Sequence, residues 1–365
     1  MGFLPVILIA CGVAGSFAWW LTLARRPDLR RKLWPAFRFR PAPWGAFDVL
    51  GAFFLVLLMA GLPWDQGLLD RDATLRDGRL AAGNAAPSAL PGMEADRPAE
   101  SRRSGEISPE NGSLAGLPGY GESRLTSAES DQNRSHGLWI LLQDRPTPAT
   151  FLLCFLVAVI AAPLMEETLF RLLFQGWLAT RELRLRRRLK GLSRAPGRDA
   201  PSWIIAQPRW FGLFSVSVVA ACFSLIHIRS TSDVPSADAI LAILLRQLCG
   251  YGAALPLLVL WLAWGRGVRA RMWGLARETF WPDVLLGLRW FATLAVPIYG
   301  LQVGLSAITP DSVVVDPLTL FPFGFVSGLL CLRSGRLLPA IVFHMALNGT
   351  SLTLAAMLLL SGALS

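Results

Sequence analysis

Two adjacent glutamates and an arginine lie within an apolar part of the chain, in the stretch APLMEETLFR. Glu167 and Arg171 are four residues apart, and in a helix this spacing places opposite charges on one face. Glu166 points about 100° away around the same helix and needs another partner. A charged residue at the centre of a membrane costs about 3 kcal/mol. The three residues therefore form either a structural ion pair with a glutamate at the water boundary or part of a functional site.

Two of the three histidines lie in other apolar segments, far apart in the sequence. His227 follows Phe223 by four residues in FSLIHI, and His344 precedes Asn348 by four residues in FHMALNG. An imidazole in an apolar helix destabilises it unless its nitrogens find hydrogen-bond partners. These groups satisfy one another if they converge with Glu166. A carboxylate, two imidazoles and an amide can together hold and activate a water molecule.

The segments that must position these residues are long and apolar. The chain has 365 residues, of which 53% are hydrophobic and 16% charged, and its mean hydropathy is +0.46. These values exclude an ordinary soluble domain. Because a helix needs about 20 apolar residues to cross a membrane, we predict an all-α, polytopic membrane helix bundle of about eight transmembrane helices. They are expected at residues 3–23, 44–62, 148–165 running on toward 180, 208–228, 239–264, 284–306, 317–332 and 337–362.

One predicted span is too long for a single crossing. Residues 148–180 would make roughly 50 Å of helix, and Pro163 is expected to break it, because proline cannot donate a helical hydrogen bond.

The basic residues fall in alternate connecting segments, such as 24–40 and 181–198. This pattern is typical of loops that set membrane topology and places both chain ends outside. Because the charges cluster between the apolar spans, no nucleic-acid partner is expected.

Four short motifs, taken together and in this order, resemble those of the CPBP family of intramembrane endopeptidases, which includes CAAX proteases, bacteriocin-processing enzymes and type II CAAX prenyl endopeptidases. The chain departs from the family pattern at Leu172, where a glycine is usual, and in the nearly ninety residues between the second and third motifs. The matching residues are Glu166, Glu167 and Arg171 (EExxxR), Phe223 and His227 (FxxxH), Phe321, Gly324 and Gly328 (FxxGxxxG), and His344 and Asn348 (HxxxN).

The resemblance implies a glutamic-type intramembrane endopeptidase that hydrolyses a peptide bond of a membrane-associated or prenylated substrate. In the family's mechanism Glu166 and His227 deprotonate a water molecule. His344 and Asn348 then stabilise the oxyanion that forms.

Three further residues are expected to support this site. Glu167 and Arg171 are interpreted as an ion pair, and Phe223 belongs to the motif of His227. Helix packing is the expected role of Gly324 and Gly328, which have the small-xxx-small spacing that lets helices approach closely.

No cofactor or metal is implied, but zinc is an alternative. Glu166, His227 and His344 match the two-histidine, one-glutamate ligand set of catalytic zinc sites. Against zinc, the chain has no HExxH motif, and Asn348 is placed like an oxyanion donor.

The chain is predicted to have three parts. Residues 1–64 hold two N-terminal transmembrane helices. Residues 65–147 are rich in Gly, Pro, Ser and charged residues and are predicted to be an external disordered loop. Residues 148–365 form the CPBP-like catalytic membrane domain, with a two-helix insertion at about 239–306.

Two other functions are kept as alternatives to proteolysis. A non-catalytic membrane scaffold or immunity-type protein would share the fold, and a proton-coupled transporter would use intramembrane Glu and His to relay protons. We expect an integral protein of the bacterial plasma membrane, whose partners are the lipid bilayer and a membrane-associated peptide or protein substrate. The sequence does not identify that substrate.

Overall fold

The computed structural model describes residues 3–33, 41–61, 137–193, 211–228, 236–308 and 315–361. Every regular element within these ranges is a helix, which confirms the predicted all-α polytopic membrane bundle. Among the described residues, five helical segments are long and apolar enough to cross a membrane. They are Pro148–Leu189, Ala237–Gly265, Ala270–Ile308, Val315–Ser334 and Leu338–Leu360.

Two predicted spans are shorter as helices than the sequence suggested. Residues 44–62 contain α3 (Ala46–Gly61), which has 16 residues, and residues 208–228 contain α11 (Leu213–Leu225), which has 13. Residues 208–210 lie outside the described part of the chain. The first predicted span corresponds to α1 (Phe3–Arg25).

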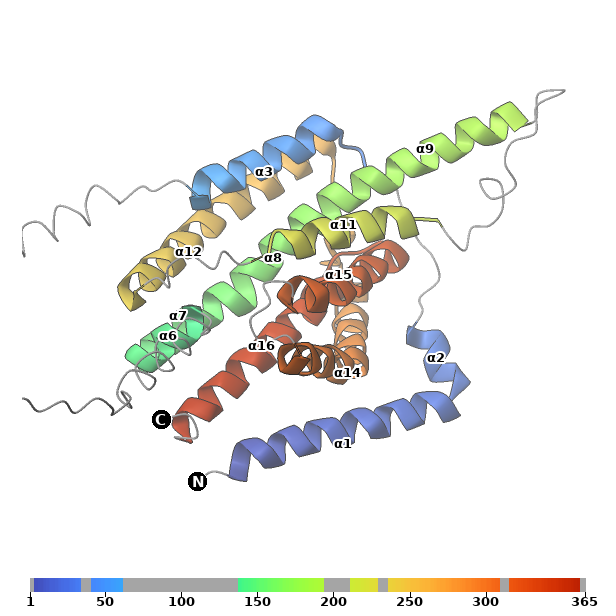
Figure 1. The fold of residues 1–365 in the computed structure, drawn as a ribbon. Helices are drawn as coiled ribbons and strands as arrows, with labels where there is room; N and C mark the ends of the chain where they lie inside the picture. The colour runs from blue at the N-terminus through green and yellow to red at the C-terminus, as the bar shows by residue number, and fades with distance from the viewer. Residues whose placement is uncertain are drawn as a thin grey trace, which may run out of the picture. The chain divides into compact units, whose positions relative to one another are not determined.

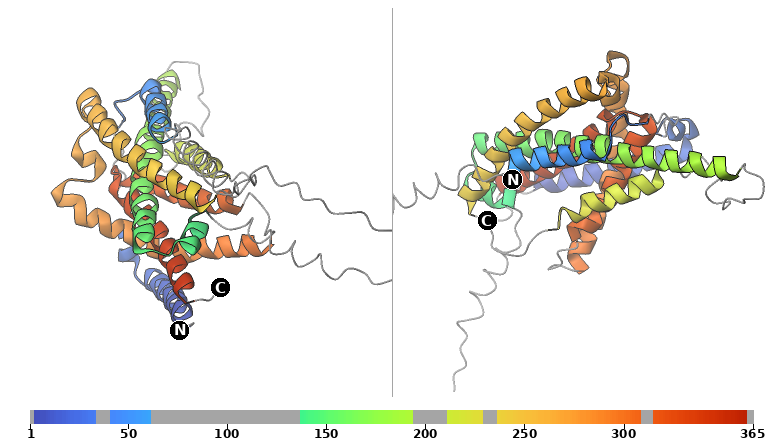
Figure 2. Two further views of the ribbon diagram at one scale, coloured as in Figure 1. Left: turned by 90° about the vertical axis from the view of Figure 1, so that its left-hand side faces the viewer. Right: turned by 90° about the horizontal axis from the view of Figure 1, so that it is seen from above.

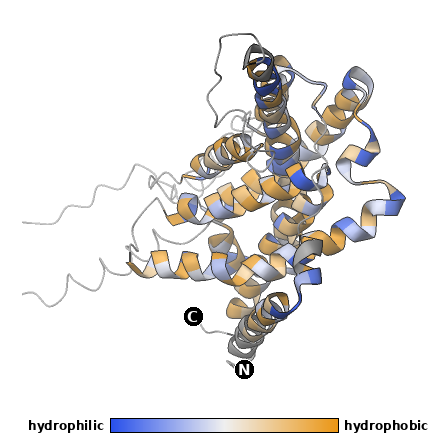
Figure 3. Cartoon of the chain, turned by 90° about the vertical axis from the view of Figure 1, so that its right-hand side faces the viewer, coloured by the Kyte–Doolittle hydropathy of each residue, from blue (hydrophilic) through white to orange (hydrophobic). Residues whose placement is uncertain are grey.

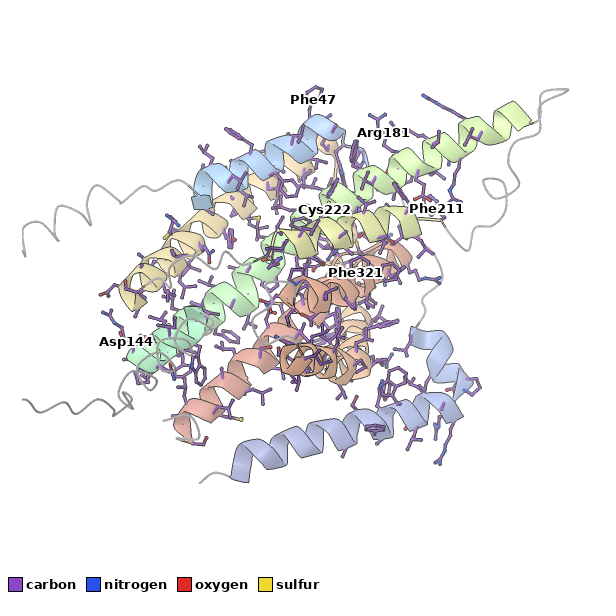
Figure 4. All side chains as sticks on the ribbon, in the orientation of Figure 1. Phe47, Asp144, Arg181, Phe211, Cys222 and Phe321 are labelled. Carbon is purple, nitrogen blue, oxygen red and sulfur yellow. The ribbon has the colours of Figure 1, made fainter. Side chains whose placement is uncertain are left out.

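The outward surface of the helices is apolar, as a lipid environment requires. Figure 3 shows that most of the drawn helices are hydrophobic over much of their length. On α3, Phe47 points away from the neighbouring helices (Figure 4), and its exposed fraction is 89%. Phe54 and Leu57 on the same helix are both 67% exposed. Contact with lipid tails lowers the free energy of such side chains relative to contact with water.

One long helix carries the two glutamates and runs between the helices around it (Figure 1). It passes without interruption through α7 (Pro148–Cys154), the π-helical segment η1 (Phe155–Ala161), α8 (Ala162–Glu166), a second π-helical segment η2 (Glu167–Gln175) and α9 (Gly176–Ser193).

The prediction that Pro163 breaks this helix is wrong. Pro163 lies at the start of α8, directly after the π-helical turn of η1, and the backbone stays in the right-handed helical region on either side. The switch from π-helical to α-helical hydrogen bonding at this point compensates for the backbone hydrogen bond that Pro163 cannot donate.

Helices on two sides pack against this long helix. On one side α3 contacts η2, and α12 (Ala237–Leu260) contacts η1 and α8; Figures 1 and 2 show α3 lying alongside α12. On the other side α11, α15 (Val315–Ser334) and α16 (Leu338–Leu360) contact the long helix and α11 packs along α15. The residues of α15 and α16 are thereby brought next to Glu166 and Glu167.

α14 (Arg277–Ile308) packs against α15 and α16 and is fixed at one end by an ion pair. Arg336, in the turn between α15 and α16, donates two hydrogen bonds of 2.5 Å to the buried Asp283. On its outer side, α14 accepts hydrogen bonds from Ser16 and Trp19 of α1.

The end of the predicted disordered loop is a helix. α6 (Gly137–Asp144) packs against α12, and its Leu141 and Leu142 are buried among apolar side chains. The prediction of disorder is therefore wrong for residues 137–144, where the apolar sequence GLWILLQD was grouped with the polar segment before it. Residues 65–136 lie outside the described part of the chain, and the remaining domain boundaries stay predictions.

Candidate active site

Glu167 stands at the first position of η2, with its side chain fully enclosed. Its Oε2 accepts a hydrogen bond of 2.7 Å from the Ser327 hydroxyl and lies 3.4 Å from Arg171 Nε. Its Oε1 lies 3.0 Å from His344 Nδ1. The expected ion pair with Arg171 is present. Glu167 also joins η2 to α15 and α16, a role that the spacing alone did not reveal.

The carboxylate of Glu167 determines which nitrogen of His344 carries the proton. A carboxylate paired with arginine only accepts hydrogen bonds, so the proton lies on Nδ1. The other nitrogen, Nε2, lies 3.8 Å from Glu166 Oε2. This distance exceeds that of a direct hydrogen bond, and a single water molecule can contact both groups. The side chain of Glu166 is 21% exposed, whereas that of His344 is 6% exposed.

His227 lies just beyond the end of α11, in a turn, and is half-buried. Its Nδ1 is 2.7 Å from the carbonyl oxygen of Phe223. Because a carbonyl only accepts, Nδ1 is the donor, and Nε2 of the neutral ring can accept a proton. The imidazole interacts electrostatically with Glu166, and its ring centre is 4.7 Å from that of Phe223.

Asn348 lies one turn after His344 on α16, but its amide is already engaged. Nδ2 donates a hydrogen bond of 2.8 Å to the carbonyl oxygen of Ala158 in η1. One of its two N–H groups therefore anchors α16 to the long helix, and the second is the one that a substrate oxygen could use.

Phe223 packs at the centre of the aromatic residues around the site. Its ring centre is 5.0 Å from the guanidinium carbon of Arg171 and 6.1 Å from the ring centre of His344. A guanidinium at this distance over an aromatic face is attracted by the ring. Phe223 thus contacts both histidine rings and Arg171, and its supporting role stays a prediction.

The glycines of α15 allow this helix to approach η2. A Cβ atom at Gly324 would lie 3.1 Å from Arg171 Nη2, and one at Gly328 would lie 2.7 Å from Gln175 Oε1. Both positions are too close for a larger side chain without a shift. Phe321, the first residue of the same motif, is 38% exposed.

Sequence reasoning missed several residues of the site. Ser327 could have been suspected, because it lies one turn after Gly324 on the same face of the helix. Gln175 lies two turns after Glu167, at a spacing that repeats the Glu167–Arg171 interval. Tyr251 of α12 interacts electrostatically with Glu166, and no motif pointed to it. No sequence pattern indicated the buried Phe323 either, whose ring lies next to that of His344.

Within the described ranges, no three His, Cys, Asp or Glu side chains are grouped so that they could hold a metal ion. The zinc alternative is therefore left to a direct measurement of metal content and metal dependence.

The fold and these contacts define a polytopic membrane protein with a buried cluster of Glu, His and Arg. A family model described as type II CAAX prenyl endopeptidase Rce1-like matches residues 148–350, more than half of the chain. The chain belongs to this Rce1-like family of CAAX-type intramembrane endopeptidases, and the resemblance inferred from the motifs is confirmed. Comparison with curated proteins and with solved structures gives no match.

Proposed function

We propose that the chain is a glutamic-type endopeptidase that hydrolyses a peptide bond within the membrane by means of a water molecule activated at Glu166. The observation that carries the proposal is the gap of 3.8 Å between Glu166 Oε2 and His344 Nε2. Around this gap, each histidine has its Nδ1 occupied by an acceptor, so that both Nε2 atoms are left for chemistry.

The proposed reaction begins with proton transfer from water to Glu166, assisted by His227. The water oxygen forms a bond to the carbonyl carbon of the substrate, and the carbonyl oxygen becomes an oxyanion. His344 and the second N–H of Asn348 stabilise that oxyanion. The C–N bond then breaks, and Glu166 returns the proton to the departing amine.

Glu167 has a defined part in this scheme. To donate from Nε2 to an oxyanion while Nδ1 holds its proton, His344 must be an imidazolium. The buried carboxylate of Glu167, 3.0 Å from Nδ1, stabilises that charged form. Glu167 is therefore a positioning residue, because it acts on the substrate through His344.

The substrate side of the proposal follows from the family and the membrane helices. A membrane-associated or prenylated peptide would reach Glu166 from the lipid, since the apolar outer surface of the helices faces the same environment as a lipid anchor. We also propose that the protein is located in the bacterial plasma membrane.

Cleavage by the purified protein tests the function. The chain in detergent is incubated with a set of prenylated and unmodified membrane-associated peptides, and the products are identified by mass spectrometry. We expect cleavage by the natural chain and by Asp28→Asn, which alters an exposed carboxylate of α2 (Pro27–Leu33), outside the site. With Glu166→Gln we expect the cleavage rate to fall by about 10³-fold, and equal product formation by that variant would refute the proposal.

The same variants address the alternatives. Glu166→Gln retains the site's shape, so it can be used to capture bound substrate from native membranes for identification by mass spectrometry. A scaffold protein would give a bound partner and no product with any variant. A transporter would give substrate-dependent proton flux in liposomes without cleavage.

A metal measurement decides between the glutamate mechanism and zinc. We expect much less than one zinc per purified chain and full activity after chelation. Stoichiometric zinc, with activity lost on its removal and restored on its return, would replace the proposed mechanism by one based on zinc-bound hydroxide.

A further inference from the structure

The end of α9 is a strongly basic surface that the proposed reaction does not use. Figures 1 and 2 show α9 extending past the end of α11. The sequence of α9 contains six basic residues and one acidic residue, Glu182, which contacts Arg186 at 2.7 Å. Four arginines of this helix are exposed: Arg181, Arg184, Arg187 and Arg188. The surface therefore carries positive charge that no carboxylate of its own helix neutralises.

The exposed residues of α9 are arranged in two rows along the helix. Arg181, Arg184 and Arg188 follow one another at intervals of three and four residues, which places them on one face, and they are called the arginine row. Leu185 and Leu189, four residues apart, form the leucine row beside it, since Leu185 is turned by only about 40° from Arg181. Leu185 is 58% exposed. Charged and apolar side chains thus lie next to each other on one surface.

The arginine row begins where the apolar part of the long helix ends. Trp177 lies one turn before Arg181, whose guanidinium carbon is 5.9 Å from the Trp177 ring centre. Tryptophan is enriched at the boundary between the hydrocarbon and the headgroups. From Arg181 to Arg188 the helix runs roughly 6–17 Å beyond Trp177. The headgroup layer is roughly 5–8 Å thick on each side of a bilayer, and the field of its charges extends about 8 Å further. The whole row therefore lies within reach of the headgroups.

A membrane surface with anionic lipids has the chemistry that both rows fit. Each guanidinium can donate two parallel hydrogen bonds to a phosphate group. The boundary of the acyl chains accepts the leucine row. A nucleic acid offers phosphates but no apolar layer beside them. Membrane topology requires positive charge in this segment, but it does not require that the charges form a row on one face of a helix.

We propose that the arginine row and the leucine row of α9 form a binding surface for anionic phospholipid headgroups. The guanidinium groups contact the lipid phosphates, and the leucines reach the acyl boundary. Because α9 continues from η2 without a break, the bound lipids hold the same helix that carries Glu166 and Glu167. The lipid surface does not depend on the proposed function, because it rests on the charge, exposure and position of α9 alone.

Native mass spectrometry of the full chain tests the proposal. The chain in detergent is mixed with equal amounts of phosphatidylglycerol and phosphatidylcholine that have the same acyl chains, and the lipids retained by each chain are counted. We expect phosphatidylglycerol to be retained at least about fivefold more than phosphatidylcholine, which is the effect of one basic residue at an anionic surface. Equal retention of the two lipids would overturn the proposal.

Two triple variants locate the binding surface. Arg181→Gln, Arg184→Gln and Arg188→Gln together remove the arginine row, and glutamine is as good a helix former as arginine. Arg186, Arg187 and Lys190 remain, so the segment keeps the positive charge that sets its topology.

The matched control removes three exposed arginines outside α9: Arg269→Gln, Arg271→Gln and Arg277→Gln. We expect retention of phosphatidylglycerol to fall about tenfold in the α9 variant and less than about twofold in the control. Equal losses in the two variants, or no loss in the α9 variant, would contradict the proposal. An RNA oligonucleotide is added in a parallel measurement. If the α9 variant loses RNA binding but retains phosphatidylglycerol, the surface binds nucleic acid and the proposal fails.

Discussion

Glu166 and Glu167 are neighbours in the sequence, yet they occupy opposite halves of the site. Glu167 is fully enclosed and contacts Ser327, Arg171 and His344 at 2.7, 3.4 and 3.0 Å. Glu166 is 21% exposed, and its nearest ion-pair contact is the distance of 3.8 Å to His344. Both oxygens of Glu167 are thus engaged by protein groups, whereas Glu166 is available to a substrate.

This difference separates a residue that stabilises the site, Glu167, from a residue that can react, Glu166. A carboxylate whose two oxygens both contact donors of the protein cannot take a proton from water without weakening those bonds. A side chain at the edge of the cluster can. The comparison predicts that changes in the open half reduce the rate of reaction, and that changes in the closed half reduce stability.

The largest effect is expected from Glu166→Gln. The amide cannot act as a base, and general-base catalysis contributes about 10²–10⁴-fold, so we expect the cleavage rate to fall by about 10³-fold. The unfolding temperature in detergent should match that of the natural chain. A stability loss as large as the rate loss would mean that Glu166 belongs to the closed half.

Glu167→Gln should act chiefly on stability. The variant leaves Arg171 buried without a counter-ion, and breaking a buried pair in this way costs about 3–5 kcal/mol. Denaturant unfolding in detergent measures the change. Adding Arg171→Met should recover much of the loss, because the double variant removes both charges, while the Gln carbonyl oxygen still accepts from His344 and its amide N–H donates to the hydroxyl of Ser327.

Gly328→Ala tests how tightly the closed half is packed. The new Cβ would lie 2.7 Å from Gln175 Oε1 and 3.0 Å from Val216, so we expect a loss of about 1–3 kcal/mol in unfolding free energy. Gly304→Ala is the matched control, because no heavy atom lies within 4 Å of its Cβ position. In that helical position alanine should be neutral or stabilising by about 0.5–1 kcal/mol.

The smallest effect is expected from Tyr251→Phe in the open half. The substitution removes a phenol hydroxyl within electrostatic range of the Glu166 carboxylate and leaves the ring's packing in place. We expect the cleavage rate to change by about tenfold or less, on the scale of one hydrogen bond, with unchanged stability. An altered unfolding temperature with an unchanged rate would assign Tyr251 to the scaffold.

The sequence was informative where a contact follows from the period of a single helix. The Glu167–Arg171 pair comes from an interval of four residues, and the different direction of Glu166 comes from the same geometry. The approach of His344 to Glu166 was expected because isolated polar groups in apolar helices need partners.

The sequence was uninformative where a contact depends on how two helices cross. The hydrogen bond from Asn348 to Ala158 and the position of Tyr251 near Glu166 require the relative placement of separate helices, which has no period in the sequence. The continuity of the helix through Pro163 was missed for a different reason: local chemistry disfavours it, and the π-helical turn that compensates has no residue signature.

The uninterrupted helix has a mechanical consequence. Its 42 residues from Pro148 to Leu189 extend roughly 60 Å, more than the 40–45 Å of a whole bilayer. The arginine-rich end of α9 is therefore one end of a single rigid helix, and both glutamates lie near the middle of that helix (Figure 1). Any force that tilts or rotates this end turns Glu166 and Glu167 together relative to His344. A membrane of different thickness would do the same, because a rod of fixed length adapts to it by tilting.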